Sequence, residues 1–218
     1  MELKDKIVVV TGVSRGIGRA ICSELASYGA RIIAVARDKK RLEDTQAQLG
    51  THSIIIRADV ASEEDINKVV RSALDEFGRI DIWINNAGIA VKKKLNETSL
   101  EEFENIMDTN VKGVFLGMKA AMDNIHDGII INISSGAGRH GIPGISVYSA
   151  SKFAVNGLTE AAAGETDIKI IALCPGGVDT EMHRSLFGVS PSTRPEDIAR
   201  EVRKIIEDSE NISTGSCL

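Results

Sequence analysis

The chain has 218 residues, 43% of them hydrophobic and 26% charged, a size and balance that fit one soluble globular domain. The formal net charge of −5 argues against the basic surface that general nucleic-acid binding requires. The apolar runs fall well short of the ~18 residues of a membrane span. The three cysteines, Cys22, Cys174 and Cys217, have neither the even number of a disulfide framework nor C-x-x-C metal spacing. We therefore expect a cytoplasmic protein with no bound metal, no membrane contact and no nucleic-acid partner.

Short apolar runs rich in Ile and Val recur along the chain, and their continuous character is typical of strands buried on both faces of a parallel sheet. They lie at residues 6–11, 31–36, 53–57, 80–85, 128–134 and 168–173. Helix-like segments separate them, so the predicted fold class is α/β. We expect a single-domain Rossmann fold over residues 1–218, with a doubly wound parallel sheet and helices on both faces. Ligands of such sheets bind beyond the carboxyl ends of the strands.

The first run passes into a glycine-rich turn, "TGVSRGIG" at residues 11–18, which opens the first helix. Gly12 permits a tight turn, Gly16 lets a phosphate approach the backbone, and Gly18 allows close packing of helix and strand. The free N–H groups and the positive dipole end of the helix favour a pyrophosphate. The turn therefore predicts dinucleotide binding.

The same residues also match a competing motif. "GVSRG" has the G-x-S-x-G pattern of a hydrolase nucleophile elbow, which would make Ser14 a nucleophile served by Asp179 and His183. Only one short strand precedes the turn, which is too little chain to build a sheet around an elbow. The elbow also leaves Gly18 unexplained, so the dinucleotide interpretation is preferred.

The end of the second strand bears on the choice between NAD and NADP. An acidic residue there would bind the 2′-hydroxyl of NAD, whereas arginine accommodates the 2′-phosphate of NADP. This chain has Ala36 at that place, followed by Arg37, and Arg15 in the glycine turn can reach the same phosphate. Asp38, next to Arg37, weakens the positive charge. The pattern favours NADP, with NAD kept as the alternative.

Helix boundaries are visible in three places. The first helix places Ile21 and Tyr28 on its apolar face. A later helix runs from an N-cap at Ser62 to a stop at Gly78. A third opens on the capping box of residues 99–102 and continues as one helix through residue 122.

"YSASK" places Tyr148 and Lys152 four residues apart, on one face of a helix. An ammonium within ~4–6 Å stabilises a tyrosinate and lowers the tyrosine pKa from about 10 by about 1–3 units. Tyr148 can then exchange a proton with a hydroxyl or carbonyl near neutral pH. An ordinary surface pair of these two residue types would look the same in the sequence.

With further motifs added, the chain resembles the short-chain dehydrogenase/reductase family over nearly its whole length, and within it the 3-oxoacyl-thioester reductases. The matching motifs are, in order, "TGVSRGIG" at 11–18, "DV" at 59–60, "NNAG" at 85–88, Asn110 in "TNVKG", "ISS" at 133–135, "YSASK" at 148–152 and "PGGVDT" at 175–180.

The resemblance implies a catalytic set of four residues. Tyr148 would be the general acid/base, and Lys152 would bind the nicotinamide ribose and lower the tyrosine pKa. Ser135, thirteen residues before the tyrosine, would hydrogen-bond the substrate oxygen in preference to Ser134. Asn110 would hold a water that links Lys152 to solvent.

The resemblance also implies which residues bind the dinucleotide, and those from Pro175 to Thr180 would line the nicotinamide and its phosphate. The cofactor set is Gly12, Ser14, Arg15, Gly16, Ile17, Gly18, Arg37, Asp59, Val60, Asn86, Ala87, Gly88, Tyr148, Lys152, Pro175, Gly176, Val178 and Thr180. Thr11, Asn85 and Ser134 are expected to be structural.

The activity that the resemblance implies is hydride transfer between a nicotinamide and a substrate carbon, which interconverts a carbonyl and a secondary alcohol. Tyr148 would move the proton on oxygen, and the partner would be a small-molecule carbonyl or alcohol. An NADP-binding sensor without turnover and an NAD-dependent alcohol dehydrogenase are the alternatives. Every catalytic position holds the right residue type, which favours an active enzyme.

Residues 136–144 and 181–194 are expected to select the substrate. The second segment is predicted to be a mobile lid, and its apolar residues, Met182, Leu186, Phe187 and Val189, indicate an apolar pocket. Arg139, His140 and Arg184 are expected to be solvated. The chain ends in "ISTGSCL" rather than in the last strand and tail typical of the family, so a homodimer through the long helices or a homotetramer is expected.

Overall fold

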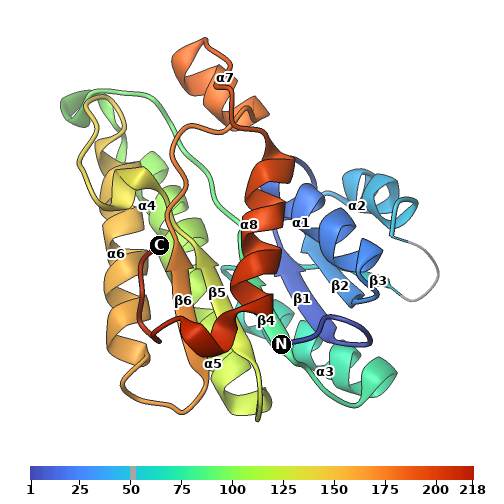
Figure 1. The fold of residues 1–218 in the computed structure, drawn as a ribbon. Coiled ribbons are helices and arrows are strands. Elements are labelled where there is room, and N and C mark those ends of the chain that lie inside the picture. The colour runs from blue at the N-terminus through green and yellow to red at the C-terminus, as the bar shows by residue number, and fades with distance from the viewer. Residues whose placement is uncertain (50–52) are drawn as a thin grey trace.

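A computed structural model describes residues 1–49 and 53–218 of the chain. Its six strands pair in parallel in the order β3-β2-β1-β4-β5-β6 (Figure 1). They are β1 (Ile7–Thr11), β2 (Arg31–Ala36), β3 (Ile54–Arg57), β4 (Ile82–Asn85), β5 (Ile129–Ile133) and β6 (Lys169–Leu173). All six lie within the Ile- and Val-rich runs, so the predicted doubly wound α/β fold is confirmed.

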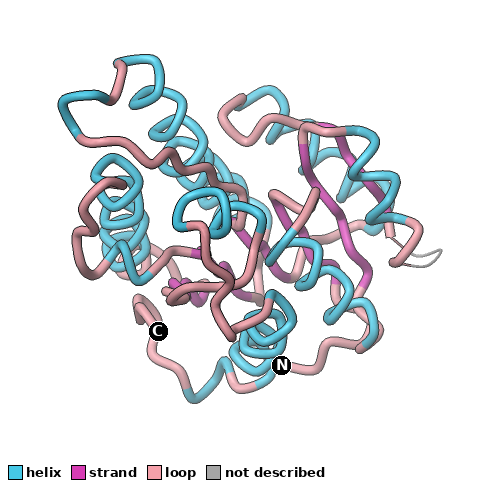
Figure 2. The backbone as a smooth tube through the Cα atoms, turned by 90° about the horizontal axis from the view of Figure 1, so that it is seen from above, coloured by secondary structure: helices cyan, strands magenta, loops and turns pink. Residues whose placement is uncertain are grey.

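The strands are apolar on both faces because helices cover the sheet from either side (Figure 2). In β1, Val8 and Val10 face one layer, while Ile7 and Val9 face the other. The first layer is built from α1 (Gly16–Ser27), α2 (Lys39–Gln46) and α8 (Pro195–Glu207). The second is built from α3 (Glu63–Phe77), α5 (Gly113–Asn124) and α6 (Ser146–Ala162). Within residues 1–49 and 53–218, no helix is both long and apolar enough to span a bilayer.

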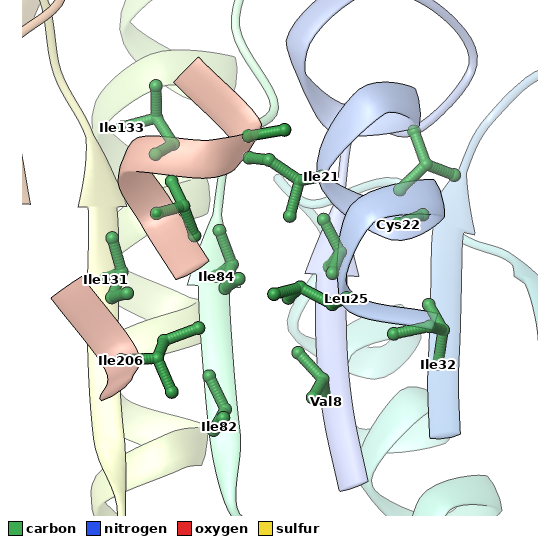
Figure 3. Packing of buried hydrophobic residues seen from close by; sticks show 14 of the residues in the cluster. Val8, Ile21, Cys22, Leu25, Ile32, Ile82, Ile84, Ile131, Ile133 and Ile206 are labelled. Carbon is green, nitrogen blue, oxygen red and sulfur yellow. The ribbon is translucent and has the colours of Figure 1, made fainter. Parts of the chain in front are cut away.

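The first layer holds α1 firmly on the sheet. Figure 3 shows Leu25 of α1 next to Val8 of β1, Ile21 of α1 further up, and Ile206 of α8 beside Ile131 of β5. All of these side chains are fully buried. Burying an aliphatic side chain of this size contributes about 1.5–3 kcal/mol. The glycine turn that precedes α1 is therefore attached to a rigid part of the core.

The predicted caps of two helices are confirmed. The Ser62 side chain accepts a hydrogen bond from the N–H of Asp65 at 3.2 Å, and Gly78 ends α3 with a φ of 74°. A capping box formed by Ser99 and Glu102 opens α4 (Leu100–Met107).

The placement of Tyr28 on the buried face of α1 is wrong. The helix ends at Ser27, one residue earlier, and the side chain of Tyr28 is 48% exposed. Its ring packs instead against the guanidinium of Arg203 on α8, with 4.4 Å between the Arg203 Cζ and the ring centroid.

The single long helix predicted from residue 99 to residue 122 is interrupted. A π-helical turn, Asp108–Lys112, lies between α4 and α5. Such turns widen the helix locally and are frequent at functional sites. This one carries the buried residue Asn110.

The last residues run beside β6, so the expectation that the chain lacks a last strand is corrected in part. The N–H of Ala172 donates to the carbonyl of Ser216 at 2.9 Å, and that of Leu218 donates to the carbonyl of Ala172 at 2.9 Å. Cys217 forms a single parallel bridge with Ala172. The tail thus takes the place of a seventh strand without forming a full ladder.

The strand order reverses between β1 and β4: the chain adds β2 and β3 on one side of β1, and β4, β5 and β6 on the other. The carboxyl ends of β1 and β4 are joined by Thr11, whose hydroxyl accepts hydrogen bonds from the N–H groups of Asn86 and Ala87 at 3.0 and 3.1 Å. Thr11 and the neighbouring Asn85 are buried, so their predicted structural role fits their surroundings. The fold therefore opens a crevice at this switch point.

Candidate active site

A cleft of about 390 Å³ lies beyond the carboxyl ends of the strands, within the usual size of a ligand site. It brings together most of the residues that the motifs predict. These are Gly12, Ser14, Arg15, Gly16, Ile17, Gly18, Arg37, Val60, Asn86, Ala87, Gly88, Tyr148, Lys152 and Thr180.

The glycine turn has the geometry that its sequence predicts. Gly12 has a φ of 72°, and a Cβ built on it would lie 2.6 Å from the Cα of Ala87. A Cβ on Gly18 would lie 2.4 Å from Nδ2 of Asn86, which donates to the carbonyl of Gly12 at 3.1 Å. The N-cap of α1 is Arg15, whose side chain has no acceptor for the free N–H groups of the first turn. Those groups are left for an anion.

Three arginines line the wall of the cleft next to β2: Arg15, Arg37 and Arg41. Ala36 stands where an acid would select NAD. Asp38 lines the cleft too, but its carboxylate is engaged at the start of α2, where it accepts from the N–H of Arg41 at 3.1 Å. Sequence reasoning missed Arg41, although the pattern of an N-cap Asp followed three residues later by arginine was visible.

Some predicted cofactor residues lie outside the lining of the cleft. Val178 is 5% exposed and packs in the apolar core, so its side chain does not face a ligand. Pro175 is buried, and its carbonyl accepts from the N–H of Gly136 at 2.8 Å, while Gly176 is exposed. Asp59 forms an ion pair with Arg37 at 3.5 Å.

Lys152 is nearly completely buried, at 4% exposure, beneath the cleft. Its Nζ donates to the carbonyl of Ile133, at the end of β5, at 2.7 Å. Because it is removed from water, the pKa of Lys152 falls to about 8. Its Nζ lies 5.8 Å from the centroid of the Tyr148 ring, one helical turn away on α6.

The structure corrects the expectation that Lys152 lowers the pKa of Tyr148. Burial raises the pKa of Tyr148 above its ordinary value, and a hydrogen bond with the side chain of Ser135 offsets this only in part. The hydroxyl of Tyr148 therefore keeps its proton at neutral pH in the ligand-free protein. A protonated phenol suits the donation of a proton to a carbonyl oxygen.

The two adjacent serines have different surroundings. Ser134 is buried and donates to the carbonyl of Lys152 at 3.2 Å, which is a structural role. Ser135 is the N-cap of the short 3₁₀ turn Gly136–Gly138, where its hydroxyl accepts from the N–H of Ala137 at 3.1 Å. Ser135 also contacts Tyr148, so the choice of Ser135 over Ser134 agrees with the geometry.

Asn110 is fully buried behind the cleft. Its Oδ1 accepts from the N–H of Ile89 at 2.8 Å, and its Nδ2 donates to the carbonyl of Ile89 at 2.9 Å and to the hydroxyl of Ser151 at 3.0 Å. A Cβ on Gly88 would lie 3.4 Å from the Asn110 Oδ1 and 3.7 Å from the Lys152 Nζ. Asn110 and Lys152 thus flank the same glycine.

The hydrolase elbow is not assembled. Asp179 forms an ion pair with Arg184 at 2.6 Å, and Nδ1 of His183 lies 3.2 Å from the carbonyl of Val189. Arg184 is solvent-exposed as expected, and it also pairs with Asp179. Among the described residues, none of these contacts links Ser14 to a base.

The predicted lid forms a short helix, α7 (Glu181–Phe187), which lies beyond the sheet at the top of Figure 1. Its apolar side chains form a small cluster with residues near Tyr148: Ala90, Ala137, Ile142, Ile145, Tyr148, Met182, Leu186 and Phe187. Val189 is 58% exposed and does not join this apolar wall as expected. Glu181 and Met182 line the cleft itself, together with Ala36, Asp38, Arg41, Ala58, Ile89, Thr109, Ile133 and Ser134, none of which is in the predicted cofactor set.

Comparisons with known proteins agree with this geometry. Residues 6–188 match the family model of the short chain dehydrogenases. An NADPH-dependent pterin aldehyde reductase of Arabidopsis thaliana is 40% identical over 195 residues, covering 86% of this chain and 81% of the relative. The crystal structure of a 3-ketoacyl-(acyl-carrier-protein) reductase from Brucella melitensis complexed with NADH superposes with a TM-score of 0.93 at 29% identity, covering 99% of this chain and 96% of the other. Levodione reductase gives a TM-score of 0.91 at 28% identity, covering 99% and 95%. The cleft, its glycine turn and these likenesses together show that the chain belongs to the short-chain dehydrogenase/reductase family of oxidoreductases.

Proposed function

We propose that the protein is an NADP(H)-dependent carbonyl reductase with Tyr148 as its general acid/base. The observation that carries the proposal is that Tyr148, with Ser135 beside it and Lys152 below it, opens onto the same cleft as the glycine turn. One cleft thus holds a dinucleotide cradle at one end and a proton donor at the other.

The residues of the cleft fit a 2′-phosphorylated dinucleotide. The N–H groups at the start of α1 suit the pyrophosphate, and the forks of Arg15, Arg37 and Arg41 suit a 2′-phosphate. The pterin aldehyde reductase is named as NADPH-dependent, whereas the Brucella melitensis reductase is in complex with NADH. The arginines, and the alanine at position 36, favour NADP in this chain. NAD is the alternative that the test below addresses.

When bound, the nicotinamide supplies the hydride. Tyr148 donates its proton to the carbonyl oxygen, which becomes the hydroxyl of the alcohol, and Ser135 orients the same oxygen by a hydrogen bond. Lys152, with a pKa of about 8, is close enough to neutral pH to return a proton toward Tyr148. We propose that Asn110, beside Lys152 at Gly88, holds the water that connects this relay to solvent, through the second lone pair of its Oδ1.

We propose a small-molecule carbonyl substrate flanked by an apolar group. Its binding site would lie between Tyr148 and α7, where Ile142, Met182 and Leu186 belong to one apolar cluster. The names of the relatives, a pterin aldehyde reductase, a ketoacyl reductase and levodione reductase, cover an aldehyde and ketones. The reduction of a carbonyl to a hydroxyl is common to all of them.

We also propose a homodimer or homotetramer assembled through α4, α5 and α6, in the cytoplasm. Each of these helices presents one large exposed aromatic side chain: Phe103 is 43% exposed, Phe115 50% and Phe153 47%. Exposed phenyl rings gathered on neighbouring helices mark an interaction surface. The three free cysteines are compatible with a reducing compartment.

The test is a screen of nicotinamide absorbance with NADPH and with NADH against a panel of aldehydes and ketones. We expect turnover with NADPH and a kcat for Tyr148→Phe that is lower by about 10²–10⁴-fold, since general acid catalysis contributes that much. The variant should bind NADPH as tightly as the wild type. Full activity of Tyr148→Phe would remove the assigned role, and tight NADPH binding without turnover on any carbonyl would favour the sensor.

A further inference from the structure

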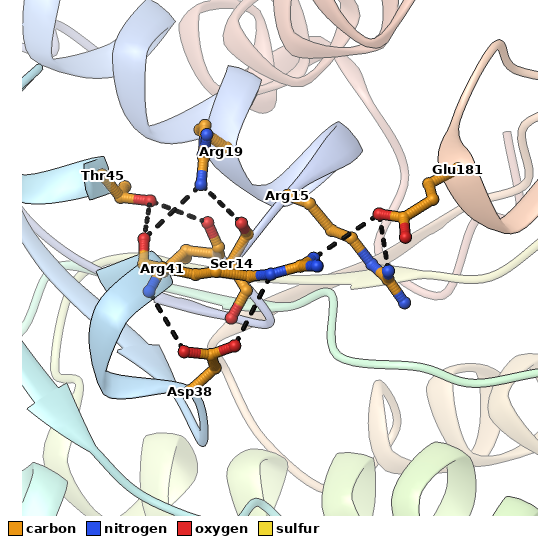
Figure 4. Close-up of polar contacts among 8 residues, drawn as sticks. Ser14, Arg15, Arg19, Asp38, Arg41, Thr45 and Glu181 are labelled. Atoms are coloured by element: carbon orange, nitrogen blue, oxygen red, sulfur yellow. Dashed lines mark hydrogen bonds and ion pairs between the residues drawn. The ribbon is translucent and has the colours of Figure 1, made fainter. Parts of the chain in front are cut away.

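Glu181, the first residue of α7, holds two of the cleft arginines at once. Its carboxylate lies 2.6 Å from Nη1 of Arg15 and 3.5 Å from Nη1 of Arg41. Figure 4 shows the carboxylate approached by the side chains of both arginines. The Arg15 guanidinium keeps the pKa of Glu181 below its usual value, so the carboxylate is charged at neutral pH.

The backbones that carry these arginines are tied to each other. Nη2 of Arg19 donates to the carbonyl of Ser14 at 2.6 Å and to that of Arg41 at 3.5 Å. The hydroxyl of Thr45 donates to the carbonyls of Val13 and Arg41 at 3.1 and 2.9 Å. The glycine turn and α2 therefore form one unit (Figure 4). A change in the ion pairs would therefore leave the backbones of Arg15 and Arg41 in place.

The rest of α7 contacts the other end of the cleft. Met182, Leu186 and Phe187 belong to the apolar cluster that contains Tyr148 and Ile142. One helix of 7 residues thus touches both the arginines and the wall of the proposed substrate pocket. A ligand that displaces Glu181 from the arginines would therefore also remove one of the contacts that hold α7 near Tyr148.

We infer that Glu181 occupies, in the cofactor-free protein, the arginines that bind the 2′-phosphate of the cofactor, and that this phosphate releases the start of α7 when it displaces the carboxylate. The inference rests on the proposed preference for NADP. A 2′-phosphate carries about −1.5 to −2 charges and three acceptor oxygens, against one charge and two oxygens on the carboxylate. Glu181 is 57% exposed and its ion pairs are solvated, so the exchange is easy in both directions.

Glu181 is then a determinant of cofactor specificity. By competing for Arg15 and Arg41, it lowers the affinity for any ligand with a 2′-phosphate and leaves ligands without one largely unaffected. The substrate pocket also responds to the identity of the bound cofactor, because only the phosphorylated form displaces Glu181 from both arginines.

The experiment compares adenosine 2′,5′-bisphosphate with adenosine 5′-monophosphate, which differ only in the 2′-phosphate and lack the nicotinamide. Calorimetric titration should show that Glu181→Gln binds the bisphosphate about two- to tenfold more tightly than the wild type, the effect of two exposed ion pairs. Binding of the monophosphate should be the same in both proteins. An unchanged affinity of Glu181→Gln for the bisphosphate would overturn the inference.

Hydrogen exchange of the amides in residues 181–187 is the second readout. In the wild type, the bisphosphate should speed exchange there and the monophosphate should not, whereas Glu181→Gln should exchange fast without ligand and gain nothing from the bisphosphate. Asp38→Asn is the matched control, because it removes a carboxylate 3.5 Å from Arg41 while leaving α7 attached. In this variant, hydrogen exchange in residues 181–187 should respond to the bisphosphate as it does in the wild type.

The two readouts separate this inference from the proposed cofactor. If the wild type binds both nucleotides equally, the proposed preference for NADP is wrong, and so is the role of Glu181 that rests on it. If the wild type prefers the bisphosphate but exchange in residues 181–187 does not respond to it, only the role of Glu181 is refuted.

Discussion

The amine of Lys152 is buried, and no carboxylate among the described residues forms an ion pair with it. Its Nζ donates to a neutral backbone carbonyl, that of Ile133, and burial lowers its pKa from 10.5 to about 8. In the unfolded chain the same amine stays protonated up to a pH of about 10.4. The residue therefore lowers the stability of the folded protein at neutral pH, which is consistent with a role in function rather than in packing.

The lowered pKa of Lys152 predicts a contribution to stability that depends on pH. Between pH 8 and pH 10 the unfolded state binds more protons at Lys152 than the folded state does, so the contribution of this residue to the free energy of unfolding rises with pH. Urea titrations should show that the wild type gains up to about 3 kcal/mol relative to Lys152→Met between pH 7 and pH 10. Comparison with the variant cancels the other groups that titrate in this range. A difference that stays constant with pH would contradict the lowered pKa.

Arg37 is the residue at which the cofactor preference can be tested most directly. Its side chain is 60% exposed and, within residues 1–49 and 53–218, forms an ion pair with Asp59 alone, at 3.5 Å, so it is accessible to a phosphate. Arg37→Ala should weaken binding of NADPH by about tenfold, the value of a charge-assisted hydrogen bond, and that of NADH by less than about twofold. Arg31→Ala, at the opposite end of β2, is the control and should bind both cofactors normally. Equal weakening of NADPH and NADH by Arg37→Ala would undo the assignment.

At the scale of elements, the glycine turn links local backbone geometry to ligand binding. Gly18→Ala would place a Cβ 2.4 Å from the Asn86 Nδ2 and 2.5 Å from the Gly12 carbonyl oxygen, so α1 would have to shift away from the turn. We expect a loss of about 1–3 kcal/mol in the free energy of unfolding and weaker binding of both NADPH and NADH. Gly164→Ala, whose Cβ would make only an ordinary contact at 3.5 Å, should change neither by much. Denaturation and cofactor titration of the two variants check this.

The elements also show which features a sequence reveals. The six strands could be predicted because buried parallel strands need continuous runs of branched apolar residues, as in "KIVVVT". The caps at Ser62 and Ser99 could be predicted because a side chain bonds a backbone group three residues away. The π-helical turn around Asn110 could not, since its residues have the same apolar spacing as an ordinary helix.

At the scale of the whole molecule, contacts between distant parts of the chain limit what can be predicted from the sequence. The motifs identify Arg15 and Arg37 as phosphate-binding residues, but not Glu181, which meets Arg41 across 140 positions of sequence. The raised pKa of Tyr148 was missed for the same reason. The spacing to Lys152 is local, whereas the burial of the phenol depends on residues from several loops and on α7.

The proposed oligomer, assembled through α4, α5 and α6, is a property of the whole molecule. The aromatic side chains of Phe115 on α5 and Phe153 on α6 are about half exposed, at 50% and 47%. A glutamate at each position would place carboxylates in a desolvated subunit interface, which is costly. On a monomer the same carboxylates would stay in water. The double variant Phe115→Glu/Phe153→Glu should therefore run as a monomer in light-scattering chromatography, while the wild type runs as a dimer or tetramer. Tyr28→Ser, which removes an aromatic of similar exposure (48%) at the end of α1, should keep the oligomeric state of the wild type. An oligomer that survives the double variant would place the subunit contact elsewhere, because two buried carboxylates could not be accommodated on this face.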